Sequence, residues 1–543
     1  MVDIQFIGLL NATLQAATLL FIAALGELIT EKSGILNLGV EGMISVGAVS
    51  GFIAAINSGS LFFAIIIGVL SASVFASIHA FILCLLVVIF YGCNDDSKPN
   101  IIWITIEDQS QYLLPFNGND DVTLPNLEDI AKESLIFDNM YATYPVCAPA
   151  RSSIITGMYP NSIGTHNMRA LSYGTYKKTG KLGERNENEK VLDIPRYSSK
   201  LAESIKTFPT ILRENGYFTF NKAKGDYNFI ISDSTWSEYG TKKKFKKSDS
   251  PFFAVYNYNI THESSMWQRD KEPLLVNPNN LKIPPIFPND SIVRHSLAVN
   301  YSNLIEMDKQ VGKLIGELKR DGIYDDSYIF FYSDHGGPFP RHKRAIYETG
   351  TKVPFFVKVP KGKNEDVDKN QLLSFIDFAP TMLSIAGIEP PSFLQGKAFL
   401  GQFKDESQRE YLFTASDRFD ENPDRIRAVR DKKFKYIRNY YPENSHALNV
   451  AYRRQMVLMR HLTALHLRGE LSDSEDLWFR VPKLREELYD LENDPFELNN
   501  LSNNPDYSDK LKNLNGVLDN WIEEIDDLGR IPEKELYKMI SGD

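Results

Sequence analysis

Pro145 to Gly157 reads P-V-C-A-P-A-R-S-S-I-I-T-G, and this stretch decides how the rest of the chain is interpreted. We expect an extended approach, a break at Pro149, and a helix whose first turn starts near Ala150-Arg151. Cys147 would then lie at the positive end of a helix, where an anion or an activated nucleophile is stabilised. A cysteine taken alone is more often a small buried hydrophobic residue. The whole string is what favours a functional site.

The composition is that of an ordinary globular protein, since 24% of the 543 residues are charged and 43% are hydrophobic. This length allows several domains, or one large core plus a smaller one. The net charge of −10 argues against a nucleic-acid-binding protein. An anionic substrate must therefore be attracted by a local basic cluster. The three cysteines, Cys84, Cys93 and Cys147, give no disulfide framework.

Residues 1–93 differ in kind from the remainder. Three apolar runs with few charges lie there: Ile7–Leu25, Ile44–Ile56 and Leu61–Phe90. The last run is long enough to span a bilayer, and the lack of an amphipathic period argues against buried core helices. Ala23–Met43 resembles the start of ABC permeases for nucleosides and simple sugars, and the resemblance ends near residue 80. A fragment of this size cannot form a transport path.

A second signal overlaps the end of this region. The apolar Phe81–Phe90 is followed by Tyr91–Cys93 and then by polar residues, which resembles a bacterial lipoprotein signal with Cys93 as the lipidated residue. Alternatively, Cys93 simply ends a membrane helix. A permease fragment joined to a lipoprotein signal, by gene fusion or by an assembly error, would explain the overlap. Both interpretations predict that the rest of the chain is tethered to a membrane outside the cytoplasm, in the periplasm or at the cell surface.

Four predicted strands are followed by side chains that can do chemistry. The pairs are Ile101–Ile106 with Glu107-Asp108, Gly216–Phe220 with Lys224, Pro251–Ile260 with His262, and Tyr328–Tyr332 with Asp334-His335. The carboxyl ends of parallel strands form the usual site edge of an α/β sheet. An adjacent acidic pair is more often a solvated turn, but a buried strand before it favours a cation site.

The string C-x-P-x-R followed by S-S-I-I-T-G, at Cys147–Gly157, resembles the signature of the formylglycine-dependent sulfatases, and the resemblance covers residues 98–535. In that family the cysteine is oxidised to formylglycine, whose hydrate is the nucleophile. The motifs G-D-Y-N-F, N-I-T-H-E-S and D-H-G-G-P-F-P are most similar to the branch that contains heparan N-sulfatase and bacterial polysaccharide sulfatases.

This resemblance implies an alkaline-phosphatase-like α/β sandwich with a large mixed, mostly parallel sheet and a smaller C-terminal α+β subdomain. The expected division is a membrane and signal region at 1–93, a catalytic domain at 98–415 and the C-terminal subdomain at 416–543. Phe375–Gly387 is expected to be a structural helix, and Leu511–Ile525 an amphipathic closing helix.

The resemblance also implies a metal site. Calcium would be held by four side chains together with residue 147: Glu107, Asp108, Asp334 and His335. Glu107 is a departure, because the common pair at this place is two aspartates. The ion would polarise both the sulfate and the formylglycine hydrate.

The remaining roles follow from the same resemblance. Arg151 would stabilise the hydrate oxyanion while one hydroxyl of residue 147 attacks sulfur. His262, with Lys343, would assist the departure of the alcohol or amine, and Lys224 and Lys343 would hold sulfate oxygens. Asp226 stands where many sulfatases have a histidine. Basic residues around Lys343, namely Arg341 and Arg344, would supply the positive charge that the overall composition lacks.

The implied function is hydrolysis of O-sulfate or N-sulfate in a sulfated carbohydrate, after a formylglycine-generating enzyme has modified Cys147. One alternative is a phosphonate monoester or phosphodiester hydrolase, since some of these share C-x-P-x-R. A membrane transport component, suggested by residues 1–80, belongs to a different class. The third alternative is a catalytically dead module that binds sulfated glycans and keeps Cys147 as a thiol.

Overall fold

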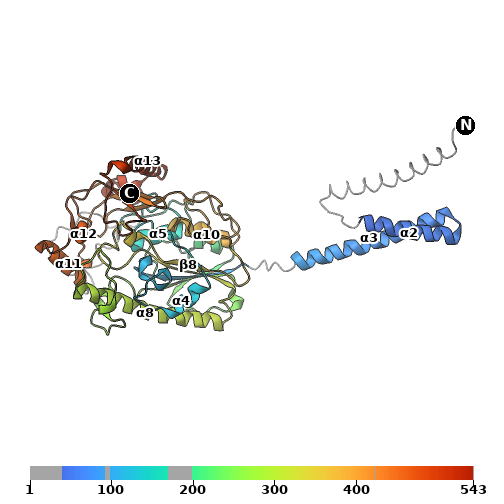
Figure 1. Cartoon of the computed structure of the whole chain (residues 1–543), viewed down its shortest axis with the longest axis horizontal. Helices are drawn as coiled ribbons and strands as arrows, with labels where there is room; N and C mark the ends of the chain where they lie inside the picture. The colour runs from blue at the N-terminus through green and yellow to red at the C-terminus, as the bar shows by residue number, and fades with distance from the viewer. Residues whose placement is uncertain (1–39, 92–97, 169–198, 242, 421, 542–543) are drawn as a thin grey trace. The chain divides into compact units, whose positions relative to one another are not determined.

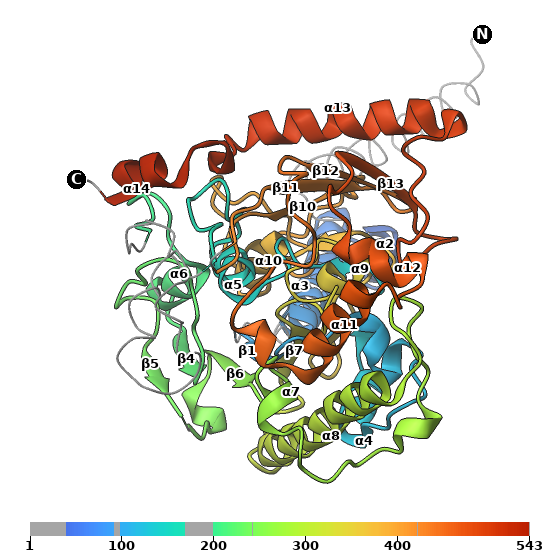
Figure 2. The same cartoon turned by 90° about the vertical axis from the view of Figure 1, so that its left-hand side faces the viewer.

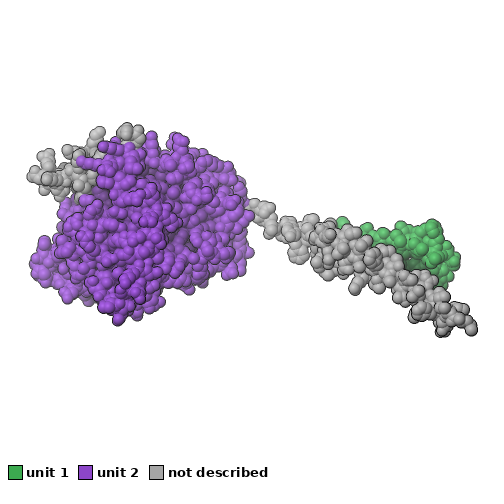
Figure 3. Space-filling model, turned by 90° about the horizontal axis from the view of Figure 1, so that it is seen from above, with its two compact units in different colours: residues 1–97 green, residues 98–543 purple. Residues whose placement is uncertain are grey.

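The structure is a computed structural model that describes residues 40–91, 98–168, 199–241, 243–420 and 422–541 (Figure 1). The chain divides into two compact units, Met1–Ser97 and Lys98–Asp543 (Figure 3). The expected run Ile7–Leu25, most of the permease-like stretch and Cys93 lie outside the described residues.

The first unit contains a pair of apolar helices, α2 (Val40–Ser58) and α3 (Leu61–Tyr91). They approach closely at glycines, because a Cβ on Gly68 would lie only 2.9 Å from the carbonyl oxygen of Gly47. Small residues at a helix contact are typical of membrane helices. The part of α3 from Leu61 to Ile82 is long and apolar enough to cross a membrane, and only 6% of its apolar window is buried. This confirms an apolar helix where the sequence predicts one.

The second unit is built on a mixed sheet of seven strands in the order β2-β8-β7-β1-β6-β4-β5. The central β1 (Asn100–Ile106) pairs in parallel with β6 (Phe252–Tyr258) and β7 (Ser327–Ser333), and all three strands are buried along their whole length. The other strands are β2 (Leu135–Ile136), β4 (Phe218–Lys222), β5 (Glu238–Gly240) and β8 (Phe355–Lys358). Six of the seven strands run in one direction and β8 is reversed, so the expectation of a mostly parallel sheet is confirmed.

Helices cover both faces of this sheet (Figures 1 and 2). One face carries α4 (Pro125–Lys132) and α8 (Ser291–Arg320), and the other carries α5 (Cys147–Thr156), α6 (Phe208–Glu214) and α10 (Phe378–Ile385). Successive residues of β1 point to opposite faces. Ile102 and Ile104 accordingly belong to the core under α8, while Trp103 belongs to the core under α10.

The apolar period of Asn300–Asp321 in the sequence predicts a helix there, and helix α8 begins nine residues earlier, at Ser291. The Asp290 side chain caps it by accepting hydrogen bonds from the backbone amides of Ile292 and Val293. The predicted helix lay within the apolar period, and the additional turns come from this cap and from tertiary packing.

A second, antiparallel sheet of four strands lies near the C-terminus: β10 (Leu412–Ser416), β11 (Ile426–Arg430), β12 (Phe434–Asn439) and β13 (Glu486–Asp490). Helix α13 (Ser508–Glu524) covers it and buries Leu514, Leu518 and Trp521 (Figure 2). The sheet starts at Leu412, a few residues before 416. Because residues 98–543 form one compact unit, the domain boundary at 415 stays a prediction.

Short elements connect these layers: β3 (Met140–Tyr141), α7 (Ser265–Gln268), α9 (Glu348–Thr351), β9 (Leu373–Ser374), α11 (Val457–Arg468), α12 (Asp473–Asp476) and α14 (Glu533–Ser541).

Candidate active site

Four adjacent strands, β7, β1, β6 and β4, deliver the predicted site residues to one edge of the sheet. Ile106 pairs with Ser333 on one side and with Tyr258 on the other. The residues that follow these strands therefore emerge side by side. This register brings together Glu107, Asp108, Asp334 and His335, with His262 and Lys224 on the side of β6 and β4.

Helix α5 begins at Cys147 itself, so the predicted break at Pro149 and the predicted start near Ala150 are wrong. Proline is tolerated in a first turn because the amide that it lacks has no acceptor within the helix. Cys147 lies at the N-terminal end of the helix, as expected, and it is fully buried. Gly157 ends the helix with a φ of +68°, a conformation that favours glycine.

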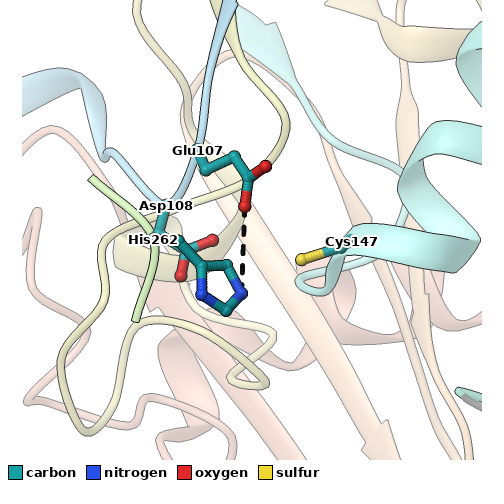
Figure 4. Close-up of side chains that lie close together, drawn as sticks. All are labelled: Glu107, Asp108, Cys147 and His262. Atoms are coloured by element: carbon teal, nitrogen blue, oxygen red, sulfur yellow. Dashed lines mark ion pairs between the residues drawn. The ribbon is translucent and has the colours of Figure 1, made fainter. Parts of the chain in front are cut away.

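The thiol of Cys147 points toward the acidic edge of the sheet (Figure 4). Its Sγ atom lies 3.2 Å from Nε2 of His335 and 3.4 Å from Nζ of Lys343. Burial disfavours the thiolate, but the charges of Lys224 and Lys343 dominate and lower the pKa of Cys147. A group at this position is held in an environment that favours negative charge.

Two overlapping groups of side chains have the spacing of a metal site. In each group, one potential ligand atom per residue lies within 4.8 Å of the others. The groups are Asp108, Cys147, Asp334 and His335, and Glu107, Asp108, Cys147 and His262. Together they contain all five residues that the sequence predicts as ligands.

The donor set fits a divalent cation. Oε1 of Glu107 and Oδ1 of Asp108 are buried and accept no hydrogen bond from the part of the chain that the structure describes. Nδ1 of His335 donates to the carbonyl oxygen of Gly336 at 3.0 Å, which leaves Nε2, 3.1 Å from Oδ1 of Asp108, as the ring atom that could bind a cation after losing its proton. Burial opposes a charged ring, but Asp334, Cys147 and Asp108 raise the pKa of His335 to about 10. These carboxylates favour positive charge, and oxygen ligands of this kind suit Ca²⁺.

Arg151 and Lys224 hold the ligand carboxylates from the other side. The Nε atom of Arg151 donates to Oδ2 of Asp334 at 2.9 Å, and its Nη1 donates to Oδ1 of Asn257 at the same distance. Nζ of Lys224 lies 2.9 Å from Oε2 of Glu107 and 3.3 Å from Asp226. Asn257 was not predicted, because an asparagine within a buried strand has no motif that reveals it.

His262 and Lys343 lie together beside the thiol. Nζ of Lys343 donates to Oδ2 of Asp108 at 2.7 Å and lies 3.3 Å from Nε2 of His262. The amide of Ser264 donates to Nδ1 of His262 at 3.2 Å, while the ammonium of Lys343 faces Nε2. Burial and the charge of Lys343 lower the pKa of His262 to about 4. Nε2 also lies 3.8 Å from Oε2 of Glu107, the contact drawn as a dashed line in Figure 4, which becomes an ion pair when the ring is protonated.

Glu263 is a further residue that sequence reasoning missed. Its carboxylate is fully buried and accepts hydrogen bonds from Arg344 at 2.8 and 3.0 Å and from Nε of Arg453 at 3.1 Å. Its backbone amide donates to Oδ2 of Asp108 at 2.6 Å. The place of Glu263 directly after His262 was a usable signal. Arg453, which lies 190 residues away in the short helix η6 (Arg453–Gln455), had none.

The three residues of the predicted basic cluster, Arg341, Lys343 and Arg344, have different contacts. Only Lys343 contacts the thiol and the carboxylates. Arg344 is engaged by Glu263, and Arg341 donates to the carbonyl oxygens of Phe496 and Glu497. The expectation that all three residues supply positive charge to the substrate is therefore wrong, because two of them neutralise or anchor other parts of the chain.

A buried thiol at a helix N-terminus thus lies against a carboxylate-rich candidate cation site at the edge of a mixed sheet. Comparison with known proteins identifies the family. The family pattern "Sulfatase" matches residues 99–245 and 230–388, and the pattern "N-sulphoglucosamine sulphohydrolase, C-terminal" matches residues 337–452. The chain belongs to the sulfatase family, and it is a sulfuric ester hydrolase.

Individual relatives agree with this. An ulvan-active sulfatase of Formosa agariphila is 39% identical over 480 residues, which cover 82% of this chain and 78% of that protein. Human N-sulphoglucosamine sulphohydrolase is 22% identical over 490 residues, 82% of this chain and 93% of the human protein. Among solved structures, a 2-O GAG sulfatase matches with a TM-score of 0.55 at 17% identity, covering 79% of this chain and 93% of that one. A phosphonate monoester hydrolase from Silicibacter pomeroyi shares the fold, with a TM-score of 0.52 at 16% identity over 79% and 96% of the two chains.

Proposed function

We propose that this chain removes sulfate from a sulfated polysaccharide, using formylglycine made from Cys147 and a calcium ion. The observation that carries the proposal is the meeting of Cys147, Lys343 and the carboxylates of Asp108 and Asp334 at one buried point. The substrate class is suggested by the relatives that act on ulvan and on N-sulphoglucosamine.

Glu107, Asp108, Asp334, His335 and residue 147 would hold the calcium ion. The ion would supply a fixed positive charge for the sulfate, and the hydrated aldehyde would supply an oxygen nucleophile that is available at neutral pH. All other steps rest on side chains of this chain.

Lys224 and Lys343 bind and orient the sulfate. Burial opposes their charged form, but the surrounding anions keep both ammonium groups charged by raising the pKa of Lys224 and of Lys343 above the ordinary value. Two fixed cations reduce the repulsion between an anionic ester and an incoming oxygen. Arg151, held by Asp334 and Asn257, stabilises negative charge that develops beside residue 147.

His262 assists the leaving group. The free site keeps its imidazole neutral, because the pKa of His262 lies at about 4. A bound sulfate ester brings negative charge next to the ring and raises this pKa. Once the ring is protonated, Nε2 donates a proton to the departing oxygen or nitrogen.

The test uses the full chain, co-expressed with a formylglycine-generating enzyme and purified in detergent. Released sulfate and phosphate are measured by ion chromatography with ulvan, heparan sulfate, an aryl sulfate and a phosphodiester. Sulfate release that is lost in Cys147→Ala supports the proposal. Release of phosphate alone would make the chain a phosphodiester hydrolase. Formylglycine at residue 147, measured by mass spectrometry, distinguishes an unmatured enzyme from an enzyme without activity on these glycans.

The N-terminal helices give the proposed location. We propose that they tether the enzyme to a membrane, with the sulfatase unit outside the cytoplasm, where polysaccharides are met. Separation of membrane from soluble fractions, followed by protease treatment of intact cells, tests this placement.

A further inference from the structure

A pocket with a volume of about 620 Å³ opens from the catalytic cluster. Its inner end is formed by Glu107, Lys224 and His262, which also belong to the cluster. The other lining residues are mostly polar and include one further carboxylate: Asp226, Asn259, Ile260, Ser264, Ser265, Gln268 and Gln310. This pocket therefore receives whatever is attached to the sulfate.

Three residues with amide side chains line this pocket from separate elements. Asn259 follows β6, Gln268 is the last residue of α7, and Gln310 lies in the middle of the long helix α8. None of these three amide groups makes a hydrogen bond to another residue within the described ranges. Each amide offers both a donor and an acceptor, which matches a hydroxyl group, whereas a second sulfate only accepts.

The charged residues that line the pocket also favour hydroxyl groups over a second sulfate. Lys224 is the one lysine or arginine among the described lining residues, and its ammonium already contacts Glu107 at 2.9 Å and Asp226 at 3.3 Å. The carboxylate of Asp226 also lines the pocket. A second sulfate on the same ring would approach this carboxylate and the neutral amides, so like-charge repulsion would select against it.

We propose that this pocket binds a sugar ring that carries one sulfate and free hydroxyl groups, and that Gln268 and Gln310 determine this specificity. The inference rests on the proposed function and specifies its substrate. Binding energy from the hydroxyls orients the ring, so that its ester oxygen faces His262.

The experiment compares Gln268→Leu and Gln310→Leu with wild type in the matured full chain. Leucine keeps the approximate volume and removes the hydrogen bonds. The substrates are ulvan oligosaccharides, the same oligosaccharides after chemical over-sulfation, and an aryl sulfate without sugar hydroxyls. Gln408→Leu is the matched control, because Gln408 is not among the lining residues of the pocket and its amide donates to Asp368 at 3.2 Å.

We expect wild type to prefer native over over-sulfated oligosaccharides. Each pocket variant should lower the ratio of kcat/KM for the native oligosaccharide to kcat/KM for the aryl sulfate by about tenfold, mainly through KM, since one hydrogen bond is lost. Gln408→Leu should leave this ratio unchanged. An unchanged ratio in both pocket variants, or faster hydrolysis of the over-sulfated material, overturns the inference while the proposed function stands. Absence of sulfate release from every substrate by formylglycine-containing wild type defeats the proposed function, and the inference with it.

Discussion

The buried carboxylate of Glu263 allows a quantitative prediction. Glu263→Gln keeps the shape of the side chain and the backbone amide that donates to Asp108, but it removes the negative charge. Arg344 and Arg453 then lose their shared anion and one of its two acceptor oxygens, and Lys343 loses an anion 3.8 Å away. Three buried cations would remain with one neutralising carboxylate fewer.

Two independent arguments give the size of the effect. Burial opposes ionisation, but the charges of Arg344, Lys343 and Arg453 lower the pKa of Glu263 from 4.5 to about 2. A shift of this size corresponds to about 3 kcal/mol of folding free energy at neutral pH. Removal of one partner from a buried ion pair costs about 3–5 kcal/mol in general. We therefore expect Glu263→Gln to destabilise the protein by about 3 kcal/mol or more.

The contribution of Glu263 to folding stability depends on pH, and the sign follows from its lowered pKa. Because folding lowers the pKa of Glu263, its contribution is complete above about pH 4.5 and is lost as the pH falls toward 2. The difference between wild type and Glu263→Gln should shrink over the same interval.

The assay is urea unfolding of the full chain in detergent, followed by tryptophan fluorescence. All five tryptophans lie in residues 98–543, so the signal reports on the sulfatase unit. Glu272→Gln is the control, since Glu272 pairs with Arg269 at 2.6 Å while its side chain is 49% exposed. Exposed pairs contribute about 0.2–1 kcal/mol. A loss in Glu263→Gln no larger than that in Glu272→Gln would refute the reasoning.

Three further predictions follow from the same geometry. In thermal unfolding, removal of calcium by a chelator should lower the midpoint, and calcium added at 100 times its Kd should restore about 2.7 kcal/mol of stability. The midpoint of Asp334→Asn should respond only weakly to added calcium. Gly336→Ala should reduce kcat strongly, because the added Cβ would lie 2.6 Å from the Cα of Gly350 and displace the loop that carries Asp334. Gly316→Ala is the control and should leave activity unchanged, because open space surrounds its Cβ. Burial and the charges of Arg341 and Arg453 lower the pKa of His342 to about 3. Below pH 6.5 the unfolded chain therefore takes up a proton that the folded protein does not, and the free energy of unfolding should fall by about 1.4 kcal/mol per pH unit. In urea unfolding, His342→Gln should show a shallower dependence of stability on pH.

Much of the sheet could be predicted because its strands carry local signals. The runs at Ile101–Ile106 and Tyr328–Tyr332 are continuous apolar segments, which a strand buried on both faces requires, and the structure places β1 and β7 there. Polar residues directly after such strands were found for the same reason. The start of α5 was misjudged because Pro149 was interpreted as a break, although a first turn accepts proline.

The contacts that complete the site could not be predicted, since they join segments far apart in sequence. Asn257 holds Arg151 across 106 residues, and Arg453 reaches Glu263 across 190. Neither contact leaves a periodicity or a spacing in the chain. Only the fold shows that Arg341 and Arg344, which resemble substrate-binding cations in the sequence, contact other protein groups.

The position of Arg453 also connects catalysis to the C-terminal part of the chain. Arg453 follows β12 of the small sheet, and it donates both to Glu263 and to the carbonyl oxygen of Lys343. Lys343 in turn contacts Asp108 and Cys147. A residue supplied after the large sheet is complete thus fixes the backbone of the lysine beside the nucleophile. The segment that connects β12 to β13 therefore supports the candidate site, and a chain truncated before Arg453 would retain the carboxylates at the edge of the large sheet but lose the contact that holds Lys343.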